Sequence, residues 1–358
     1  MNYWMIEDDY IRFKRCRRQW DFASAHRRGL EAIKGVDRVL PAAIREALAV
    51  YYYPGTWDWG PDLKQSLVHK ALAGALDVAH RTAAFPAGKR LLDSYDAWAR
   101  TVDDFAPVRI GHDLQALVPD PSDPERGLTS PGGAAVMYSC RIDLLAVDAA
   151  DEYWVVCHRI VDDWQDVDAL IGDDAAVAAC WAWEQEYLGM EISGTIHNEV
   201  RLAGPLDPPD HAAERARVRQ GEPSGGGRAI PQHRRLSART SREGEPTAGS
   251  ETGIEQSTAG PLRRTRIRRS RAEIGAVGAS IGREAIAMSA DPAIYPTFAA
   301  HCRTCEFRTP CLALVQGTDP EPVLARHFRR RRTEERPKPR LGQSTWGFGR
   351  GAAPPPGW

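Results

Sequence analysis

The spacing of apolar residues predicts a chain that begins with helices. Between Asp9 and about Arg28, apolar and aromatic residues recur at mixed intervals of three and four, which indicates a helix half covered by core. In the segment 42–53 the apolar residues repeat on one face until Pro54-Gly55 ends the pattern. Further helices are expected at about 62–81 and 89–101.

The pattern then becomes typical of β-strands. Residues 108–118, 135–147 and 152–161 are rich in β-branched and aromatic side chains, with turn-forming residues between them. A long helix at about 174–188 and a returning strand at 192–202 follow. This order predicts an α/β or α+β domain with a central mixed sheet flanked by helices.

The second half of the chain divides into three parts. Residues 203–261 are dense in Pro, Gly, Ser, Glu and Arg, so we expect a disordered insertion that follows a core of residues 1–202. Residues 262–331 should complete the domain with a basic strand, a helix at 271–288 and a cysteine-rich segment. We expect a flexible tail at 332–358.

Length and composition exclude several classes of protein. With 358 residues, of which 42% are hydrophobic, the chain can build one large domain or two ordinary ones. It has no run of about 18 uncharged apolar residues, and its N-terminus is acidic, so we expect a soluble cytoplasmic protein without a membrane partner. Seven cysteines, an odd number, favour metal ligands or buried thiols over a disulfide framework.

The net charge of −1 conceals a strong asymmetry. Residues 1–200 hold 20 basic and 32 acidic residues, so the remainder of the chain is basic, and most of its cations are arginines. An arginine-rich half suggests a polyanion partner such as DNA, although a solvated charged face would have the same composition. The candidate phosphate contacts are Arg263, Arg264, Arg266, Arg268, Arg269 and the run 329–332.

The strongest local signal is a cluster of cysteines. Cys302, Cys305 and Cys311 fall within ten residues, and two thiolates separated by two residues can chelate one metal centre. A four-coordinate zinc or an iron–sulfur cube needs one more ligand. The candidates are Cys16, which lies among arginines that favour a thiolate, the neighbouring His301, and Cys140, Cys157 and Cys180, which are more typical of buried thiols.

These residues resemble a known family. A helix that carries Cys16-Arg-Arg-x-Trp20, together with a remote Cys-x2-Cys-x5-Cys, resembles the RecB-like PD-(D/E)XK nucleases with an iron–sulfur cluster, such as the CRISPR-associated exonucleases. The resemblance covers about residues 5–202 and 262–331. It implies a restriction-endonuclease-like core whose two ends are joined by a [4Fe–4S] cluster, or by zinc as the alternative. The implied ligands are Cys16, Cys302, Cys305 and Cys311.

The resemblance also implies a degenerate hydrolytic site. The family cleaves DNA with a divalent metal held by a histidine and two acids, beside a lysine. Asp143, in Arg141-Ile-Asp143, matches the first acid. Cys157 and Arg159 replace the second acid and the lysine, and Arg45 replaces the histidine. Because a thiol is a soft ligand and arginine a permanent cation, we expect no Mg²⁺ or Mn²⁺ there.

The expected function follows from these replacements. We expect Arg45, and Arg159 with it, to pair with Asp143 in place of the metal, while Ala175 and Ala179 replace the family's substrate-contacting Gln and Tyr. The sequence therefore favours a non-catalytic nuclease-like protein that keeps its cluster and binds DNA or an active nuclease-like subunit. The alternatives are an active metal-dependent DNA nuclease with an atypical site and a zinc-stapled protein–protein adaptor.

Overall fold

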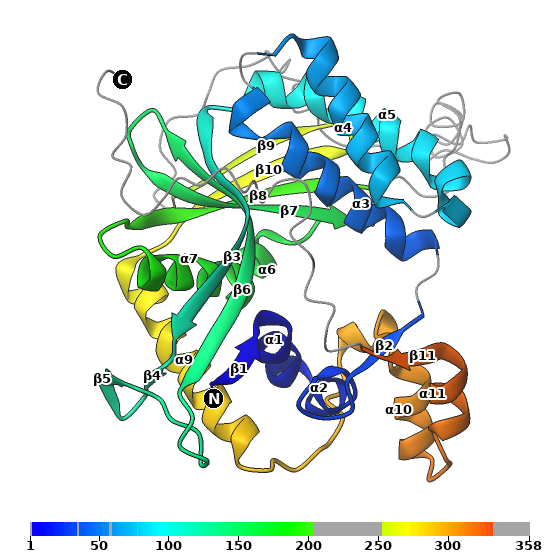
Figure 1. The fold of residues 1–358 in the computed structure, drawn as a ribbon, viewed down its shortest axis with the longest axis vertical. Coiled ribbons are helices and arrows are strands. Elements are labelled where there is room, and N and C mark those ends of the chain that lie inside the picture. The colour runs from blue at the N-terminus through cyan, green and yellow to red at the C-terminus, as the bar shows by residue number, and fades with distance from the viewer. Residues whose placement is uncertain (1, 34–35, 57–58, 77, 203–252, 332–358) are drawn as a thin grey trace, which may run out of the picture.

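A mixed sheet of seven strands forms the centre of the computed structural model, which describes residues 2–33, 36–56, 59–76, 78–202 and 253–331 (Figure 1). The strand order is β1-β6-β7-β8-β10-β9, and β3 also pairs with β6. The pairs β1–β6 and β7–β8 are parallel, and the others are antiparallel. The strands are β1 (Tyr3–Ile6), β3 (Phe105–Leu117), β6 (Val136–Asp148), β7 (Tyr153–Val161), β8 (Ile192–Arg201), β9 (Ile254–Ala259) and β10 (Leu262–Arg268). A separate hairpin pairs β4 (Pro119–Asp120) with β5 (Asp123–Gly127).

Helices cover both faces of this sheet. One core cluster joins the sheet to α3, α4 and α5, and a second joins it to α1, α7 and α9. None of the helices in the described part of the chain has the length and apolar character needed to cross a membrane. The helices are α1 (Glu7–Arg15), α2 (Arg17–Ala23), α3 (Val36–Tyr51), α4 (Pro61–Ala75), α5 (Val78–Val102), α6 (Val167–Ile171), α7 (Asp174–Glu186), α9 (Arg271–Ser289), α10 (Arg308–Val315) and α11 (Glu321–His327), with short 3-10 turns η1 (Pro54–Thr56) and η2 (Ala300–Arg303).

Strand β7 shows why the sheet strands are apolar at successive positions. Val155 belongs to the core under α1, α7 and α9, whereas Val156 belongs to the core under α3, α4 and α5. Because both faces of the strand are covered, both sets of alternating positions must be apolar. The predicted class, an α/β fold with a central mixed sheet flanked by helices, is confirmed.

The chain around Cys16 differs from the prediction of one continuous helix. Helix α1 ends at Arg15 and α2 begins at Arg17, while Cys16 is extended, with φ −164° and ψ 111°. The break lets the two helices bury different faces: Phe13 packs in the main core and Phe22 in a small cluster near the C-terminus. Cys16 is therefore presented at a corner between two helices.

Strand β9 corrects the predicted boundary of the insertion. Ile254–Ala259 lie within the segment 203–261, which the sequence predicts to be disordered, yet they pair with β10. The side chains of this edge strand are mostly exposed and polar. Its order therefore comes from backbone pairing, which leaves no apolar pattern to detect. The rest of the predicted insertion, 203–252, and the predicted tail, 332–358, lie outside the described residues.

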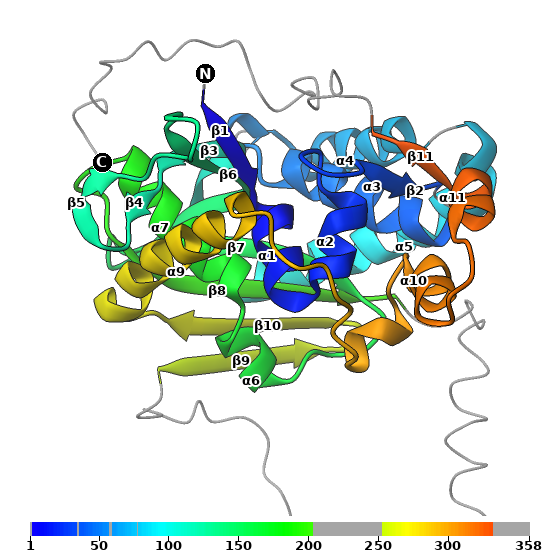
Figure 2. The same cartoon turned by 90° about the horizontal axis from the view of Figure 1, so that it is seen from below.

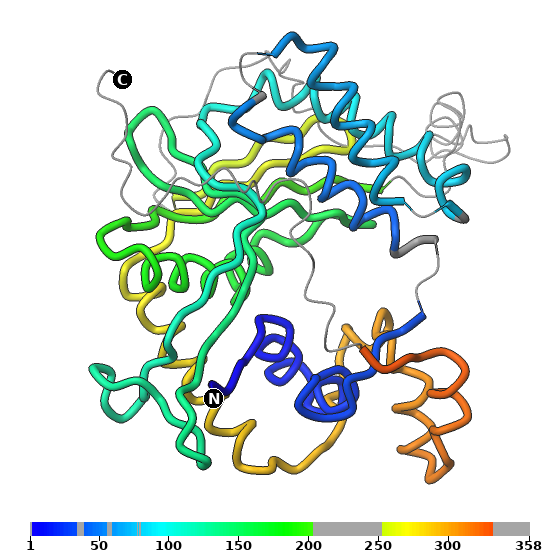
Figure 3. Tube along the Cα trace, in the orientation of Figure 1, coloured from blue at the N-terminus to red at the C-terminus, as the bar shows by residue number. Residues whose placement is uncertain are grey.

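The two ends of the described chain meet in a small lobe, formed by α2, β2 (Leu30–Ala32), η2, α10, α11 and β11 (Phe328–Arg330), which we call the terminal lobe. Strands β2 and β11 pair antiparallel, and Figures 2 and 3 show these segments side by side. Its apolar core consists of Phe22, Ala23, Phe307, Leu324 and Phe328. Residues nearly 300 positions apart therefore share one packing unit.

Gly194 on β8 provides a test of the packing between strands. A Cβ at this position would lie 2.2 Å from the carbonyl oxygen of Ile267 and 2.8 Å from the ring of Trp154. Because a backbone atom cannot move aside cheaply, Gly194→Ala should lower the free energy of unfolding by about 3 kcal/mol. Gly275→Ala in α9, where a Cβ meets nothing within 4 Å, should raise it by about 0.5–1 kcal/mol. Urea unfolding measures both, and equal effects would contradict the close strand packing.

Candidate functional site

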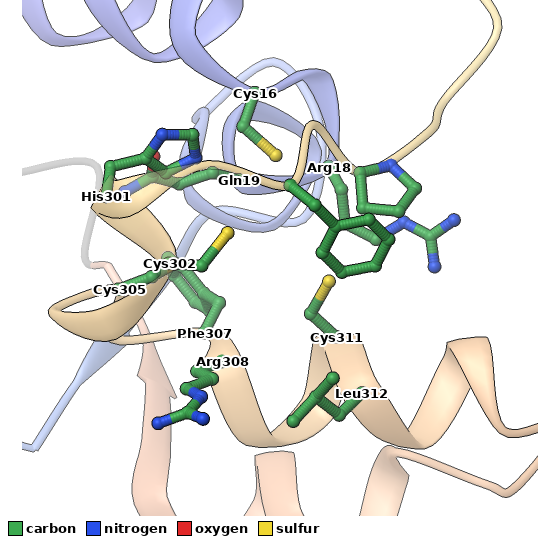
Figure 4. A pocket seen from close by; sticks show the side chains of 12 residues that line it. Cys16, Arg18, Gln19, His301, Cys302, Cys305, Phe307, Arg308, Cys311 and Leu312 are labelled. Carbon is green, nitrogen blue, oxygen red and sulfur yellow. The ribbon is translucent and has the colours of Figure 1, made fainter.

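Four cysteines line one cavity of about 170 Å³ in the terminal lobe. Cys16 comes from the α1–α2 corner, Cys302 from η2, Cys305 from the following turn and Cys311 from α10. Figure 4 shows the sulfur atoms of Cys16 and Cys311 directed into the same space. The structure thus brings together the four cysteines that the sequence grouped through its resemblance.

An extended segment between α9 and η2 connects the thiols from the two ends of the chain. The backbone N–H of Thr297 donates to Cys16 Sγ at 3.4 Å, and Cys302 Sγ donates to the Thr297 carbonyl oxygen at 3.6 Å. Cys305 and Cys311 pack against the apolar core of the terminal lobe. The backbone of Thr297 therefore positions Cys16 and Cys302, and the apolar core of the terminal lobe positions Cys305 and Cys311.

Burial raises the pKa of the Cys305 thiol and of the Cys311 thiol. The neighbouring cysteines raise both pKa values further, because each thiolate repels the next. The pKa of His301, which also lines the cavity, is lowered by burial and by the charge of Arg15. A cation bound in the cavity would have to displace thiol protons, as metals do at cysteine sites.

Three polar atoms in the cavity wall are buried without a hydrogen-bond partner among the residues that the structure describes. They are Arg18 Nε, Gln19 Oε1 and His301 Nε2, and all three residues line the cavity. An unsatisfied buried polar atom costs about 1–3 kcal/mol. A bound group with acceptor atoms, such as the sulfides of an iron–sulfur cluster, would suit the Arg18 Nε–H donor, whereas Gln19 Oε1 is an acceptor and would need a donor.

Four thiols around one cavity could supply the ligands of a single metal ion or of an iron–sulfur cluster. Within the described ranges, no three His, Cys, Asp or Glu side chains converge closely enough to hold one metal ion. Around zinc, sulfurs about 2.3 Å from the ion must crowd together, whereas each thiolate of a four-iron cluster binds a different iron. The cavity volume of about 170 Å³ is several times larger than the roughly 30 Å³ that one water molecule occupies in the liquid.

Asp143, the predicted remnant of a hydrolytic site, has different partners from those predicted. The Asp143 carboxylate accepts the backbone N–H of His158 at 2.8 Å. The predicted ion pair with Arg45 or Arg159 is wrong, since in the described part of the chain no ion pair reaches Asp143, and Arg159 pairs with Asp173. Asp173 also caps α7, which fixes its carboxylate within reach of Arg159.

Glu7 lies beside Asp143, a neighbour that the sequence did not predict. The parallel pairing of β1 with β6 brings the start of α1 beside Asp143. Burial raises the pKa of Glu7 to about 7, and the charges of Asp8 and Asp143 contribute, while Arg159 opposes the shift. The acidic run at 7–9 was its sequence signal, but only the strand register places Glu7 here. Cys157 on β7 stays a thiol, because burial raises its pKa to about 12.

Glu7 predicts a pH dependence of stability. Between its usual pKa of 4.5 and about 7, the folded chain keeps a proton that the unfolded chain releases. The free energy of unfolding should therefore fall as the pH rises through this window, by up to about 3 kcal/mol. Urea unfolding at pH 5 and pH 7.5 measures the fall, which Glu7→Gln should reduce. Equal slopes in the two proteins would remove Glu7 as its source.

The arginines of β10 do not face solvent as a free basic strip. Arg263 donates to Glu199 at 2.6 Å, and Arg264 donates to Asn198 at 2.8 Å. Arg264 and Arg266 also pair with Asp103 and Asp104, Arg268 with Glu152, and Arg269 with Glu273. Arg263, Arg264 and Arg269 are buried. This run neutralises carboxylates of its own chain, so a phosphate would have to displace them.

The remaining candidates lie on elements that border the main core. Cys140 and Cys180 are buried and Cys157 packs against the same cluster, as expected for structural thiols. Ala175 and Ala179 lie on α7.

Comparisons with known proteins do not assign the chain to a family. No protein-family model matches it, and no curated protein matches it. Among solved structures, SSO0001 is similar with 10% identity, over 76% of this chain and 93% of that one, at a TM-score of 0.29. A likeness this low carries no argument about function.

Proposed function

We propose that this protein is a non-catalytic relative of the PD-(D/E)XK nucleases whose cysteine cavity holds a [4Fe–4S] cluster, and that it binds DNA or an active nuclease-like subunit. The supporting observation is that Cys16, Cys302, Cys305 and Cys311 line one cavity. Their thiolates would hold the cluster, and the unpartnered atoms of Arg18 and His301 would face its sulfides.

The cluster would act chiefly as a cross-link. It would tie the α1–α2 corner to η2 and α10, in a lobe whose apolar core is otherwise small. When a metal group binds only the folded chain, its binding free energy stabilises the fold. The chain itself supplies the thiols, the Thr297 contacts and the aromatic packing beside Cys305 and Cys311.

The proposed loss of catalysis rests on the hydrolytic remnant. Metal-dependent phosphodiester cleavage needs hard oxygen ligands and a cation near the attacking water. Asp143 accepts a backbone N–H, Cys157 holds its proton, and Arg159 is paired with Asp173. These contacts favour a stabilised pocket over a reactive one.

Metal analysis after anaerobic purification tests the proposal. About four iron atoms and four acid-labile sulfides per chain, with broad visible absorption, are expected. One zinc and no sulfide would support the adaptor alternative instead, and neither metal would overturn both. Incubation with single- and double-stranded DNA in Mg²⁺ or Mn²⁺ should yield no cleavage.

A second candidate, an atypical metal-dependent DNA nuclease, is favoured by one observation. Glu7 lies close enough to Asp143 for their charges to interact, so two carboxyl groups are available there. Cleavage that requires Mn²⁺ and disappears in both Asp143→Ala and Glu7→Gln would establish this candidate and remove the non-catalytic one.

A further inference from the structure

Strand β9 forms an open edge of the central sheet. It pairs with β10 on one side, and in the described part of the chain no strand pairs with its other side. Figure 2 shows β9 outside β10, at the boundary of the sheet. Residues 255–259 are exposed. Such an edge presents backbone N–H and C=O groups that can pair with a further strand.

The pairing with β10 determines which backbone groups face outward. The Arg268 N–H donates to the Gly253 carbonyl oxygen at 3.2 Å, just beyond the Ile254–Ile267 pair. Ile254 and Ile267 are therefore a non-hydrogen-bonded pair, and along an antiparallel ladder such pairs alternate with hydrogen-bonded ones. The residues whose N–H and C=O groups point away from β10 are thus Ile254, Gln256 and Thr258.

The other edge strands carry features that hinder such pairing. Strand β1 is only four residues long. Strand β3, which pairs with β6 alone among the described strands, contains Pro107, a register shift beside it, and Gly111 with φ 53°. The Gln115 N–H of β3 already donates to the Glu186 carboxylate at 2.8 Å. Short strands, prolines, bulges and covered backbone groups prevent sheets from associating through their edges.

Strand β9 has none of these protective features. Its pairing with β10 is continuous, it contains no proline, and Glu255 is its single charged residue. The chain has a formal net charge of −1, so two copies would repel each other little at long range. The strand that fits this edge must match the spacing of the outward groups and must place no acid opposite Glu255.

A second copy of β9 meets both conditions. The outward residues are symmetric about Gln256, so a two-fold axis at that position would let all of their N–H and C=O groups pair, in about six hydrogen bonds. Gln256 would lie opposite the same residue of the other copy, and Ile254 opposite Thr258. Glu255 would lie opposite Ser257, so no like charges would face each other.

We propose that this protein forms a two-fold dimer in which the β9 strands of two copies pair antiparallel and join their sheets. The interface does not depend on the proposed function, and β9 contributes no residue to the cysteine cavity. Because short edge strands bury little surface, the association should be weak and reversible.

Sedimentation velocity of the whole chain, purified anaerobically, tests the dimer between about 1 and 200 µM. Gln256→Pro removes one outward N–H from each copy and keeps the ladder to β10, so it should raise the dimer Kd at least about tenfold. Gln256→Ala keeps that N–H. Like the proline variant, it loses the side-chain hydrogen bond to Thr265 Oγ1, yet it should dimerise as the original chain does.

Opposite charges at Gln256 test the register. Gln256→Lys and Gln256→Glu each place like charges opposite one another across the axis, so each variant alone should be largely monomeric where the original chain dimerises. An equal mixture of the two variants should recover dimers, because lysine then faces glutamate. Urea unfolding of each variant distinguishes lost pairing from lost folding.

Three results would overturn the inference. The first is a chain that stays monomeric up to about 200 µM. The second is a dimer that Gln256→Pro leaves intact, or that the proline and alanine variants weaken equally, since the outward N–H would then have no role. The third is a mixture of the lysine and glutamate variants that stays as monomeric as each variant alone, which would reject the two-fold axis at Gln256.

Discussion

If the cysteine cavity holds the proposed cluster, Cys305→Ser is expected to remove iron from the protein and to unfold the terminal lobe. A serine hydroxyl is a poor ligand for a centre that prefers thiolates, so the iron content should fall from about four atoms per chain to below about one. The cross-link between the two ends would be lost with it. For a loop of several hundred residues, chain entropy alone assigns such a link about 5 kcal/mol. Iron analysis and urea unfolding of anaerobic samples measure both effects.

The same chemistry at another cysteine provides the control. Cys180 is fully buried in the main core and does not line the cysteine cavity. Cys180→Ala should lower the free energy of unfolding by about 1 kcal/mol through lost packing, with iron unchanged. A Cys305→Ser protein that keeps its iron and its stability would reject the four-thiolate centre.

Arg263→Met is expected to destabilise the sheet by about 3–5 kcal/mol, because it leaves a buried carboxylate without its cation. The Glu199 side chain has no exposed surface, and Arg263 is its ion-pair partner. Its other contact is the backbone N–H of Gln165 at 2.9 Å. The fall in the free energy of unfolding would be measured in urea at neutral pH.

Arg268, an exposed arginine on the same strand, serves as a control that shows how much of the cost in free energy of unfolding comes from burial of the ion pair. The Arg268 side chain is 57% exposed and pairs with Glu152, so Arg268→Met should cost less than about 1 kcal/mol. Adding Glu199→Gln to Arg263→Met should recover part of the loss, since the unpaired charge is removed. Equal costs for the two arginine variants would show that burial of the Arg263–Glu199 pair has no energetic consequence.

Much of the fold could be predicted because strands and helices bury regular positions. The strand segments 135–147 and 152–161 agree closely with β6 and β7. The helical region 62–101 was harder, since Pro86 lies inside α5, where the sequence rules expect a helix to stop. The break lies instead near Leu76, the C-cap residue that follows α4. Packing on the sheet overrides the local preference there.

The candidate site could be predicted only where its residues are close in sequence. The spacing of Cys302, Cys305 and Cys311 predicts a metal site, and the family resemblance added Cys16 as its fourth ligand. The position of Glu7 depends on the β1–β6 register, and the partners of the β10 arginines depend on which acids lie across neighbouring strands. A sequence displays the charges of such residues but not the pairings that neutralise them.

Because β2 pairs with β11, the terminal lobe can assemble only late in synthesis. The ribosome delivers α2 and β2 early, whereas β11 is among the last described residues to emerge. Since domains fold as the chain appears, the early segments must wait without partners while the main sheet forms. Insertion of the proposed cluster would then be a late maturation event, and a nascent chain stalled before residue 302 would expose Phe22 to chaperones and proteases.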